Sequence, residues 1–125
     1  MNDERALLLV AHGSPDPDWR RPLERLVELL AAELGDAVAL AYLAHPPSLD
    51  DAIASLAQAG HRRVLVVAAL LSPGGRHVKR DIPEAVAAAR VRFAELQIEL
   101  APGALGEDPQ VIAALARASL ERLKS

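Results

Sequence analysis

Two kinds of hydrophobic pattern alternate along the chain. Short runs rich in apolar residues occupy residues 6–11, 37–43, 64–71 and 96–101, and the first of them is apolar on both sides of an extended backbone. Such runs are typical of strands buried on both faces of a parallel sheet. The longer segments between them repeat apolar residues every three or four positions, which predicts helices over residues 17–34, 48–59, 83–93 and 109–123.

The predicted helix ends carry residues that suit them. Asp16 or Asp18 is placed to cap the first helix, and Gly35 follows its last periodic residue. Ser48 precedes two aspartates at the start of the second helix, where side-chain oxygens accept from free backbone N–H groups and negative charge is favoured. Pro83 fits the first position of the third helix, because proline needs no N–H partner there.

The alternation of four strands and four helices predicts an α/β fold with a parallel sheet, helices on both faces and right-handed crossovers. We expect the strand order 2-1-3-4, in a three-layer fold of the Rossmann or flavodoxin type. No linker or low-complexity tract divides residues 1–125, so one domain is predicted. Ligands bind such sheets beyond the carboxyl ends of the strands, where the winding reverses, here between strands one and three.

Two histidines are expected at this reversal point. His12 directly follows the first strand, and His77 lies in the loop after the third. Adjacent strands are about 4.8 Å apart, so both rings can face one crevice. Two neutral imidazoles can bind a divalent transition metal, and either accepts protons near neutral pH because its free pKa is ~6.5. For either histidine alone, a structural role is the alternative. His45, after the second strand, is a third candidate ligand, whereas His61 is expected at the opposite edge on plain surface.

The loop after the third strand, GGRHVKRDIP, is the densest polar cluster of the chain. Its cations Arg76, Lys79 and Arg80 surround His77 in a protein whose net charge is −3. At a ligand crevice they suit a polycarboxylate or a phosphate; the alternative is a solvated loop face. Asp81 is placed either to orient His77 or to cap the next helix, and we favour the cap.

Other residues near the predicted crevice limit its chemistry. Gly13, Gly74 and Gly75 permit close backbone approach. No dinucleotide fingerprint or P-loop pattern is present, so no nucleotide cofactor is expected. Ser14 lacks the GxSxG context of a nucleophile elbow, which argues against a serine hydrolase. Trp19 is interpreted either as a staple for the first helix or as a flat apolar wall for a planar ligand.

Composition excludes several classes of function. The absence of cysteine rules out disulfides, zinc–thiolate sites and iron–sulfur ligation, which leaves His, Asp and Glu as metal ligands. With one Trp, one Tyr, one Phe and a negative net charge, the chain does not fit a nucleic-acid binder. The N-terminus lacks the features of a signal peptide, and no run approaches the roughly 20 apolar residues of a membrane span. We therefore expect a cytoplasmic protein without membrane contact.

Three segments, each after a predicted strand, resemble those of one enzyme family. AHGSPDPDWRRPLERL, AYLAHPPSLDDAI and GGRHVKRDIPEAV are similar to the small, single-domain CbiX-type sirohydrochlorin chelatases, class II chelatases related to SirB. The resemblance extends over nearly the whole chain and depends most on HGS…DP combined with GxHVxxDIP. It implies a chelatase-type α/β fold and a homodimer that inserts Co²⁺ or Fe²⁺ into sirohydrochlorin without ATP. Sirohydrochlorin is an octacarboxylate tetrapyrrole on the way to cobalamin or siroheme.

The resemblance also implies roles for individual residues. The two active-site histidines of the family fall on His12 and His77, which would handle the metal and accept the pyrrole protons. Around them we expect substrate contacts from Ser14, Gly75, Arg76, Lys79 and Arg80.

One departure from the family pattern affects metal binding. Where the family has an F-L-E segment with its acid near the metal, this chain has Tyr42-Leu43-Ala44, and the stretch between these residues and the following PSL is one residue shorter than in the family. Either His45 substitutes as a ligand, or metal handling is weakened or altered. A histidine in place of the acid would favour later metals such as Co²⁺ or Ni²⁺.

Two rival functions fit the same fold. The first is a non-catalytic carrier of metal or tetrapyrrole, which the missing acid at Ala44 would explain. The second is a flavodoxin-like or receiver-like signalling domain, which ranks last because the acidic cluster of a phosphoacceptor site is missing after the first strand.

Overall fold

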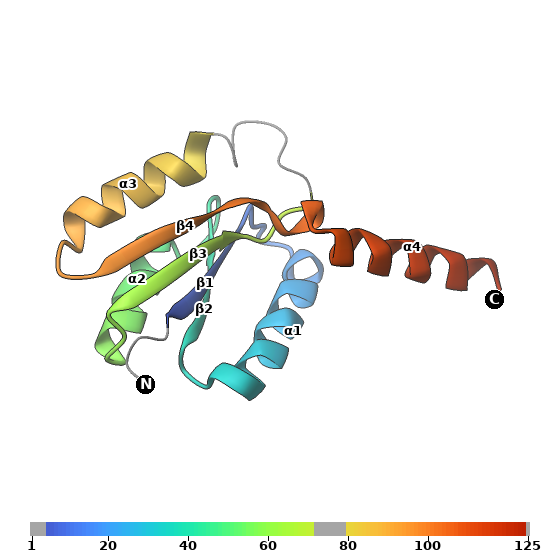
Figure 1. The fold of residues 1–125 in the computed structure, drawn as a ribbon, viewed down its shortest axis with the longest axis horizontal. Coiled ribbons are helices and arrows are strands. Elements are labelled where there is room, and N and C mark those ends of the chain that lie inside the picture. Colours follow the sequence, from blue (N-terminus) through green and yellow to red (C-terminus); the bar gives the residue numbers. More distant parts are fainter. Residues whose placement is uncertain (1–4, 72–79, 125) are drawn as a thin grey trace.

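A sheet of four parallel strands forms the centre of the protein in the computed structural model, which describes residues 5–71 and 80–124 (Figure 1). The strands are β1 (Ala6–Ala11), β2 (Val38–Tyr42), β3 (Arg63–Ala68) and β4 (Gln97–Ala104). Their order in the sheet is β2-β1-β3-β4, which confirms the predicted order.

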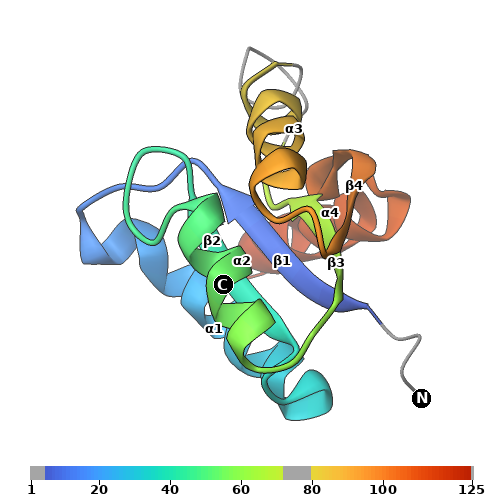
Figure 2. The same ribbon diagram turned by 90° about the vertical axis from the view of Figure 1, so that its left-hand side faces the viewer.

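Four helices alternate with the strands, as the hydrophobic pattern predicts. They are α1 (Pro17–Leu34), α2 (Leu49–Gln58), α3 (Ile82–Arg92) and α4 (Pro109–Leu123), with a short 3-10 turn, η2 (Leu105–Glu107), before the last. Helices α2 and α3 pack on one face of the sheet and α1 on the other, so the three-layer prediction is also confirmed (Figures 1 and 2). Within residues 5–71 and 80–124, no helix is long and apolar enough to cross a membrane.

The main core lies between the sheet and helices α2 and α3. Alternate residues of the strands enter it, among them Leu8, Val10, Val64 and Val66, and each is at most 1% exposed. Burial of these side chains is the main force that holds the strands and the two helices together. The opposite face is covered less evenly: Leu9 of β1 is buried, but Leu65 and Val67 of β3 are only half-buried.

Two of the predicted helix caps are present. The Asp16 side chain accepts a hydrogen bond of 2.9 Å from the backbone N–H of Asp18, so Asp16 is the cap of α1. Ser48 and Asp51 form a reciprocal capping box at the start of α2, with N···O distances of 3.1 Å in both directions. These bonds satisfy backbone N–H groups that have no partner inside the helix.

The prediction that Asp81 caps α3 is wrong. Asp81 occupies the N-cap position, but its side chain makes no capping hydrogen bond with the described residues. The physical reason is its backbone, which has helical angles (φ −66°, ψ −43°) rather than the extended ones a capping residue needs. Helix α3 also begins at Ile82, one residue before the predicted Pro83.

The ends of β3 and β4 also differ from the prediction. β3 ends at Ala68 rather than Leu71. Beyond it, the Gly106 N–H donates to the Leu70 carbonyl, and the two chains lie so close that a Cβ on Gly106 would overlap the Leu71 carbonyl. β4 continues to Ala104 rather than ending at residue 101, after a register shift opposite residues 66–68 of β3. Pro102 is tolerated in this strand because β4 lies at the sheet edge, where one side needs no N–H donor.

The last helix has the predicted bounds but not the expected position. Helices were expected to cover both faces of the sheet, yet α4 projects away from the sheet end (Figure 1). None of its residues is buried against any part of the chain that the structure describes.

Candidate functional site

The loops after β1, β2 and β3 begin side by side at the carboxyl edge of the sheet. The parallel ladder between β1 and β2 continues one step into the loops, where the Ala44 N–H donates to the His12 carbonyl at 2.8 Å. On the other side of β1, the Ala69 N–H donates to the Val10 carbonyl at 2.8 Å, so the chain leaving β3 stays beside β1. His12 therefore lies at the point where the winding of the sheet reverses, as predicted.

Close packing against Tyr42 fixes the backbone immediately after His12. Gly13 has φ +94°, which L side chains rarely adopt, and a Cβ built on it would lie 2.6 Å from the Tyr42 Cβ. Tyr42 itself is only 5% exposed and cannot move aside without disturbing the sheet. A glycine is therefore required here both by conformation and by space.

The residues after Gly13 connect this contact rigidly to α1. The Asp16 N–H donates to the Ser14 Oγ at 3.1 Å, and Asp16 in turn caps the helix. The exposed side chain of His12 thus stands between a strand and a helix start, each held by its own hydrogen bonds. Such anchoring limits where the imidazole can reach, which is what a reacting group needs.

His45 lies in the neighbouring loop, half-buried against Tyr42. Its ring meets that of Tyr42 edge to face, with centroids 5.7 Å apart, and its Nδ1 lies 2.6 Å from the Pro46 carbonyl oxygen. The loop closes where the Tyr42 N–H donates to the Pro47 carbonyl at 2.9 Å. Since a carbonyl only accepts, Nδ1 carries the proton in the neutral ring and Nε2 holds the lone pair that can bind a metal.

Tyr42 combines a buried hydroxyl with a perturbed acidity. Within residues 5–71 and 80–124, its oxygen has no hydrogen-bond partner. Burial raises the pKa of the phenol, the nearby carboxylate of Glu24 raises this pKa further, and Arg20 acts in the opposite direction. Tyr42 is therefore held as a neutral, apolar floor beneath Gly13 and His45.

Several predicted site residues lie outside the described part of the chain. These are Gly74, Gly75, Arg76, His77 and Lys79. Arg80, two residues before α3, is described: its Nε lies 3.3 Å from a carboxylate oxygen of Glu84 on that helix, in an exposed ion pair. Among the residues that the structure describes, no three His, Cys, Asp or Glu side chains form a group able to hold a metal.

Two other residues can be compared with their predicted places. His61 lies before β3 at the opposite edge, as predicted. It is not plain surface, because its side chain is only 23% exposed and its Nε2 lies 3.0 Å from an Asp36 carboxylate oxygen. The Trp19 side chain is 69% exposed, which does not fit a staple packed on the first helix.

Tyr42 is the residue of this region whose position the sequence analysis missed. From the sequence, Tyr42 was assigned no role of its own and was named only within the segment Tyr42-Leu43-Ala44. The available signal was its place at the end of the second apolar run, next in the sheet to the run that precedes His12 and Gly13.

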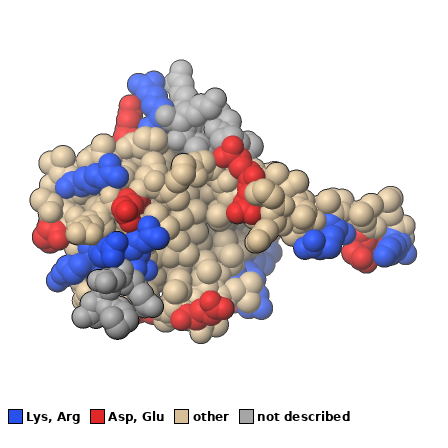
Figure 3. All heavy atoms as spheres, in the orientation of Figure 1, with Lys and Arg blue, Asp and Glu red and all other residues tan. Residues whose placement is uncertain are grey.

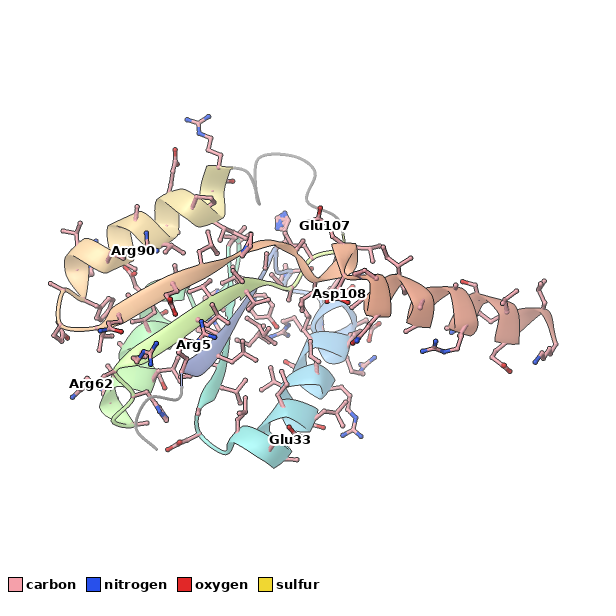
Figure 4. The ribbon with its side chains drawn as sticks, viewed as in Figure 1. Arg5, Glu33, Arg62, Arg90, Glu107 and Asp108 are labelled. Carbon is pink, nitrogen blue, oxygen red and sulfur yellow. The ribbon has the colours of Figure 1, made fainter. Side chains whose placement is uncertain are left out.

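A separate hollow of about 330 Å³ lies where β4 joins α4. Its lining includes Val67 of β3, the backbone turn at Gly103, and the acids Glu107 and Asp108, which Figure 4 labels at this junction. Of the predicted site residues that the structure describes, none lines this hollow.

Comparison with known proteins gives one family. The family model described as CbiX matches residues 6–122. A sirohydrochlorin cobaltochelatase of Saccharolobus islandicus (strain L.S.2.15 / Lassen #1) is 36% identical over 78 residues, a segment that covers 62% of this chain and 59% of that relative. The match thus spans under two thirds of the length of this curated relative.

Two solved structures are similar to this one. A cobalamin (vitamin B12) biosynthesis CbiX protein from Marinobacter aquaeolei VT8 has a TM-score of 0.85 and 27% identity, with 98% of this chain and 97% of that chain covered. The sirohydrochlorin chelatase SirB from Bacillus subtilis subspecies spizizenii, in complex with cobalt, has a TM-score of 0.67 and 26% identity over 78% of this chain and 42% of that one.

The contact between Gly13 and Tyr42 can be tested with a matched pair of variants. Gly60 has a similar φ of +99°, but no described atom lies within 4 Å of a Cβ built on it. We expect Gly60→Ala to lower the free energy of unfolding by about 1–2 kcal/mol, from backbone strain alone. Gly13→Ala should lose clearly more, because it adds an overlap with a buried ring. Urea unfolding followed by circular dichroism measures both; equal losses would contradict the close contact.

The acidity of Tyr42 can be measured directly, because it is the one tyrosine of the chain. Absorbance at 295 nm should give a midpoint above the ordinary ~10 in the folded protein and near ~10 in urea. The folded state disfavours the charged phenolate. The contribution of this group to the free energy of unfolding is therefore fully present below the unfolded pKa of ~10 and is lost as pH rises toward the higher folded pKa. Glu24→Gln should lower the midpoint, since it removes a nearby negative charge. A folded midpoint at or below the urea value would refute the assignment.

Proposed function

Because the chain belongs to the CbiX family, we propose that it is a sirohydrochlorin metallochelatase that inserts Co²⁺ or Fe²⁺ into sirohydrochlorin. The observation that carries the proposal is His12, fixed at the winding reversal within the segment that the family model matches. The likeness to SirB in complex with cobalt supports a metal substrate. The likeness to a sirohydrochlorin cobaltochelatase supports the tetrapyrrole.

We propose that His12 and His77 share two tasks in this reaction. The metal is a substrate and has to be released into the ring, which imidazole ligands permit more easily than a thiolate cage. As M²⁺ enters, two pyrrole N–H protons leave, so charge is balanced and two protons need acceptors. The His12 carbonyl is bonded to the Ala44 N–H, so the backbone of this residue is fixed and its ring is the part that would contact the metal and the macrocycle.

The cations of the loop after β3 are proposed to orient the substrate. Arg76, Lys79 and Arg80 would pair with the carboxylates that edge the macrocycle, while Ser14 and Gly75 would contact the ring at close range. Both side chains of the Arg80–Glu84 ion pair are exposed to solvent, so the pair is weak. A substrate carboxylate can replace Glu84 at little cost.

We propose that His45 provides the ligand that the missing acid would otherwise supply. Ala44, which stands where the family has its acid, is hydrogen-bonded to the backbone of His12, so the missing carboxylate would have been adjacent to that histidine. His45 is the residue after Ala44. Because its Nδ1 donates to the Pro46 carbonyl, its Nε2 carries a lone pair that can bind a metal. This ligand change favours Co²⁺, or Ni²⁺, over harder ions.

The same position supports a second candidate function. Without a carboxylate at Ala44, the protein could bind metal or sirohydrochlorin and not insert one into the other, as a carrier does. Tight binding of sirohydrochlorin with no turnover would favour the carrier.

The remaining features of the proposal concern the setting of the reaction. We propose that insertion needs no ATP, that residues 1–125 form one CbiX-like unit, and that the protein acts as a cytoplasmic homodimer. The absence of a P-loop or dinucleotide fingerprint supports the first of these points.

The enzyme proposal predicts a rate above the spontaneous one when the protein is mixed with sirohydrochlorin and Co²⁺ or Fe²⁺, followed by absorbance. His12→Ala and His77→Ala should each lower this rate by about 10²–10⁴-fold, since each removes a proton acceptor. His61→Ala, at the opposite edge, should retain it. A rate no higher than that without protein would refute the enzyme.

The proposed role of His45 predicts weaker metal binding without it. Isothermal titration with Co²⁺ should give a dissociation constant about 10–100-fold higher for His45→Ala than for the unchanged protein. His61→Ala is again the matched control, because it removes an imidazole far from the site. Unchanged affinity in His45→Ala would show that this histidine is not a ligand.

A further inference from the structure

Helix α4 exposes an apolar stripe that nothing in the described chain covers. Ile112, Leu115, Leu120 and Leu123 are 52%, 46%, 59% and 82% exposed. At 100° per residue these four lie on one half of the helix, while Arg117 and Glu121 lie on the other. A single helix of this length is only marginally stable in water, so a stripe of this kind indicates a packing partner.

The sheet has an apolar face that the described helices cover only in part. Helix α1 packs against β2, and Leu9 of β1 is buried, but Leu65 and Val67 of the neighbouring strand β3 are only half-buried. Figure 3 shows a broad area without charged side chains between β3 and α1. The hollow of about 330 Å³ beside Val67 adjoins this face, at the base of α4.

The junction before α4 directs the helix away from its own sheet. A Glu107 carboxylate oxygen accepts from the Ala104 N–H at 2.8 Å, and the Asp108 N–H donates to the Leu105 carbonyl at 3.0 Å. The Asp108 side chain caps α4 through the Gln110 N–H, also at 2.8 Å. These bonds order the turn from which α4 leaves the sheet.

We infer that two copies of this chain exchange α4, each helix laying its apolar stripe over β3 and beside α1 of the other copy. Both halves of the contact belong to one chain, so a twofold pairing covers both stripes and both sheet faces at once. The alignment with the Marinobacter aquaeolei CbiX structure covers 98% of this chain, with a TM-score of 0.85. Most residues of α4 therefore have an aligned counterpart in that structure. The exchange gives the proposed homodimer an arrangement and does not depend on chelatase activity.

The absence of native cysteine allows a direct test by disulfide cross-linking. Chains carrying Leu115→Cys are mixed, in denaturant, with chains of different length carrying either Leu65→Cys or Val67→Cys, then refolded and oxidised. The exchange predicts a covalent heterodimer with at least one of the two sheet positions. Arg117→Cys, on the opposite side of α4, is the matched control and should form little. The inference would be overturned if Leu115→Cys gave no more covalent heterodimer than Arg117→Cys, both with Leu65→Cys and with Val67→Cys.

Two further measurements separate the alternatives. A chain that carries both Leu115→Cys and Val67→Cys, or Leu65→Cys, should form covalent dimers; a fast-migrating monomer with an internal disulfide would instead mean that α4 folds onto its own sheet. In sedimentation equilibrium the unchanged chain should be a dimer. The double variant L120E/L123E, altered only at exposed positions, should raise the dimer dissociation constant about 30-fold or more. A monomeric unchanged chain would refute the exchange, whether or not the chelatase assay succeeds.

Discussion

The arrangement of the candidate site depends on the contact between the loop after β1 and the end of β2. Gly13 lies on Tyr42 so closely that no Cβ fits between them, and the Ala44 N–H holds the His12 carbonyl above this contact. The ladder of the sheet thereby extends into the loops. Because the strands beneath are buried, the position of the His12 backbone is fixed by the core rather than by the loop itself.

The chemistry of the region follows from what surrounds this contact. Tyr42 presents a neutral ring, with its pKa raised by burial, and the His45 ring packs edge-on against it. The bond from Nδ1 to the Pro46 carbonyl selects the tautomer of His45 that can coordinate a metal through Nε2. An imidazole held in this way is a reasonable substitute for the carboxylate that the chain lacks at Ala44. The proposed preference for later metals rests on this geometry.

The uneven cover of the sheet connects the fold to its assembly. Helices α2 and α3 complete a well-buried core, whereas α1 covers its face only in part and α4 leaves the body of the protein. Exposed apolar surface on a helix and on a sheet of the same chain is removed most simply by a second copy. In the inferred exchange, the helix leaves the sheet from a turn ordered by the hydrogen bonds of Glu107 and Asp108.

The sequence by itself determined the strand order, the bounds of α1 and α4, the caps at Asp16 and Ser48, and the location of His12, because these depend on local periodicity, capping chemistry and chain order. Only the tertiary structure decided the rest. Asp81 fails as a cap because its backbone is already helical, and β4 runs on past a register shift. The role of Tyr42 and the direction of α4 arise from contacts between segments that no local pattern encodes. Packing chooses among conformations that the local sequence allows equally.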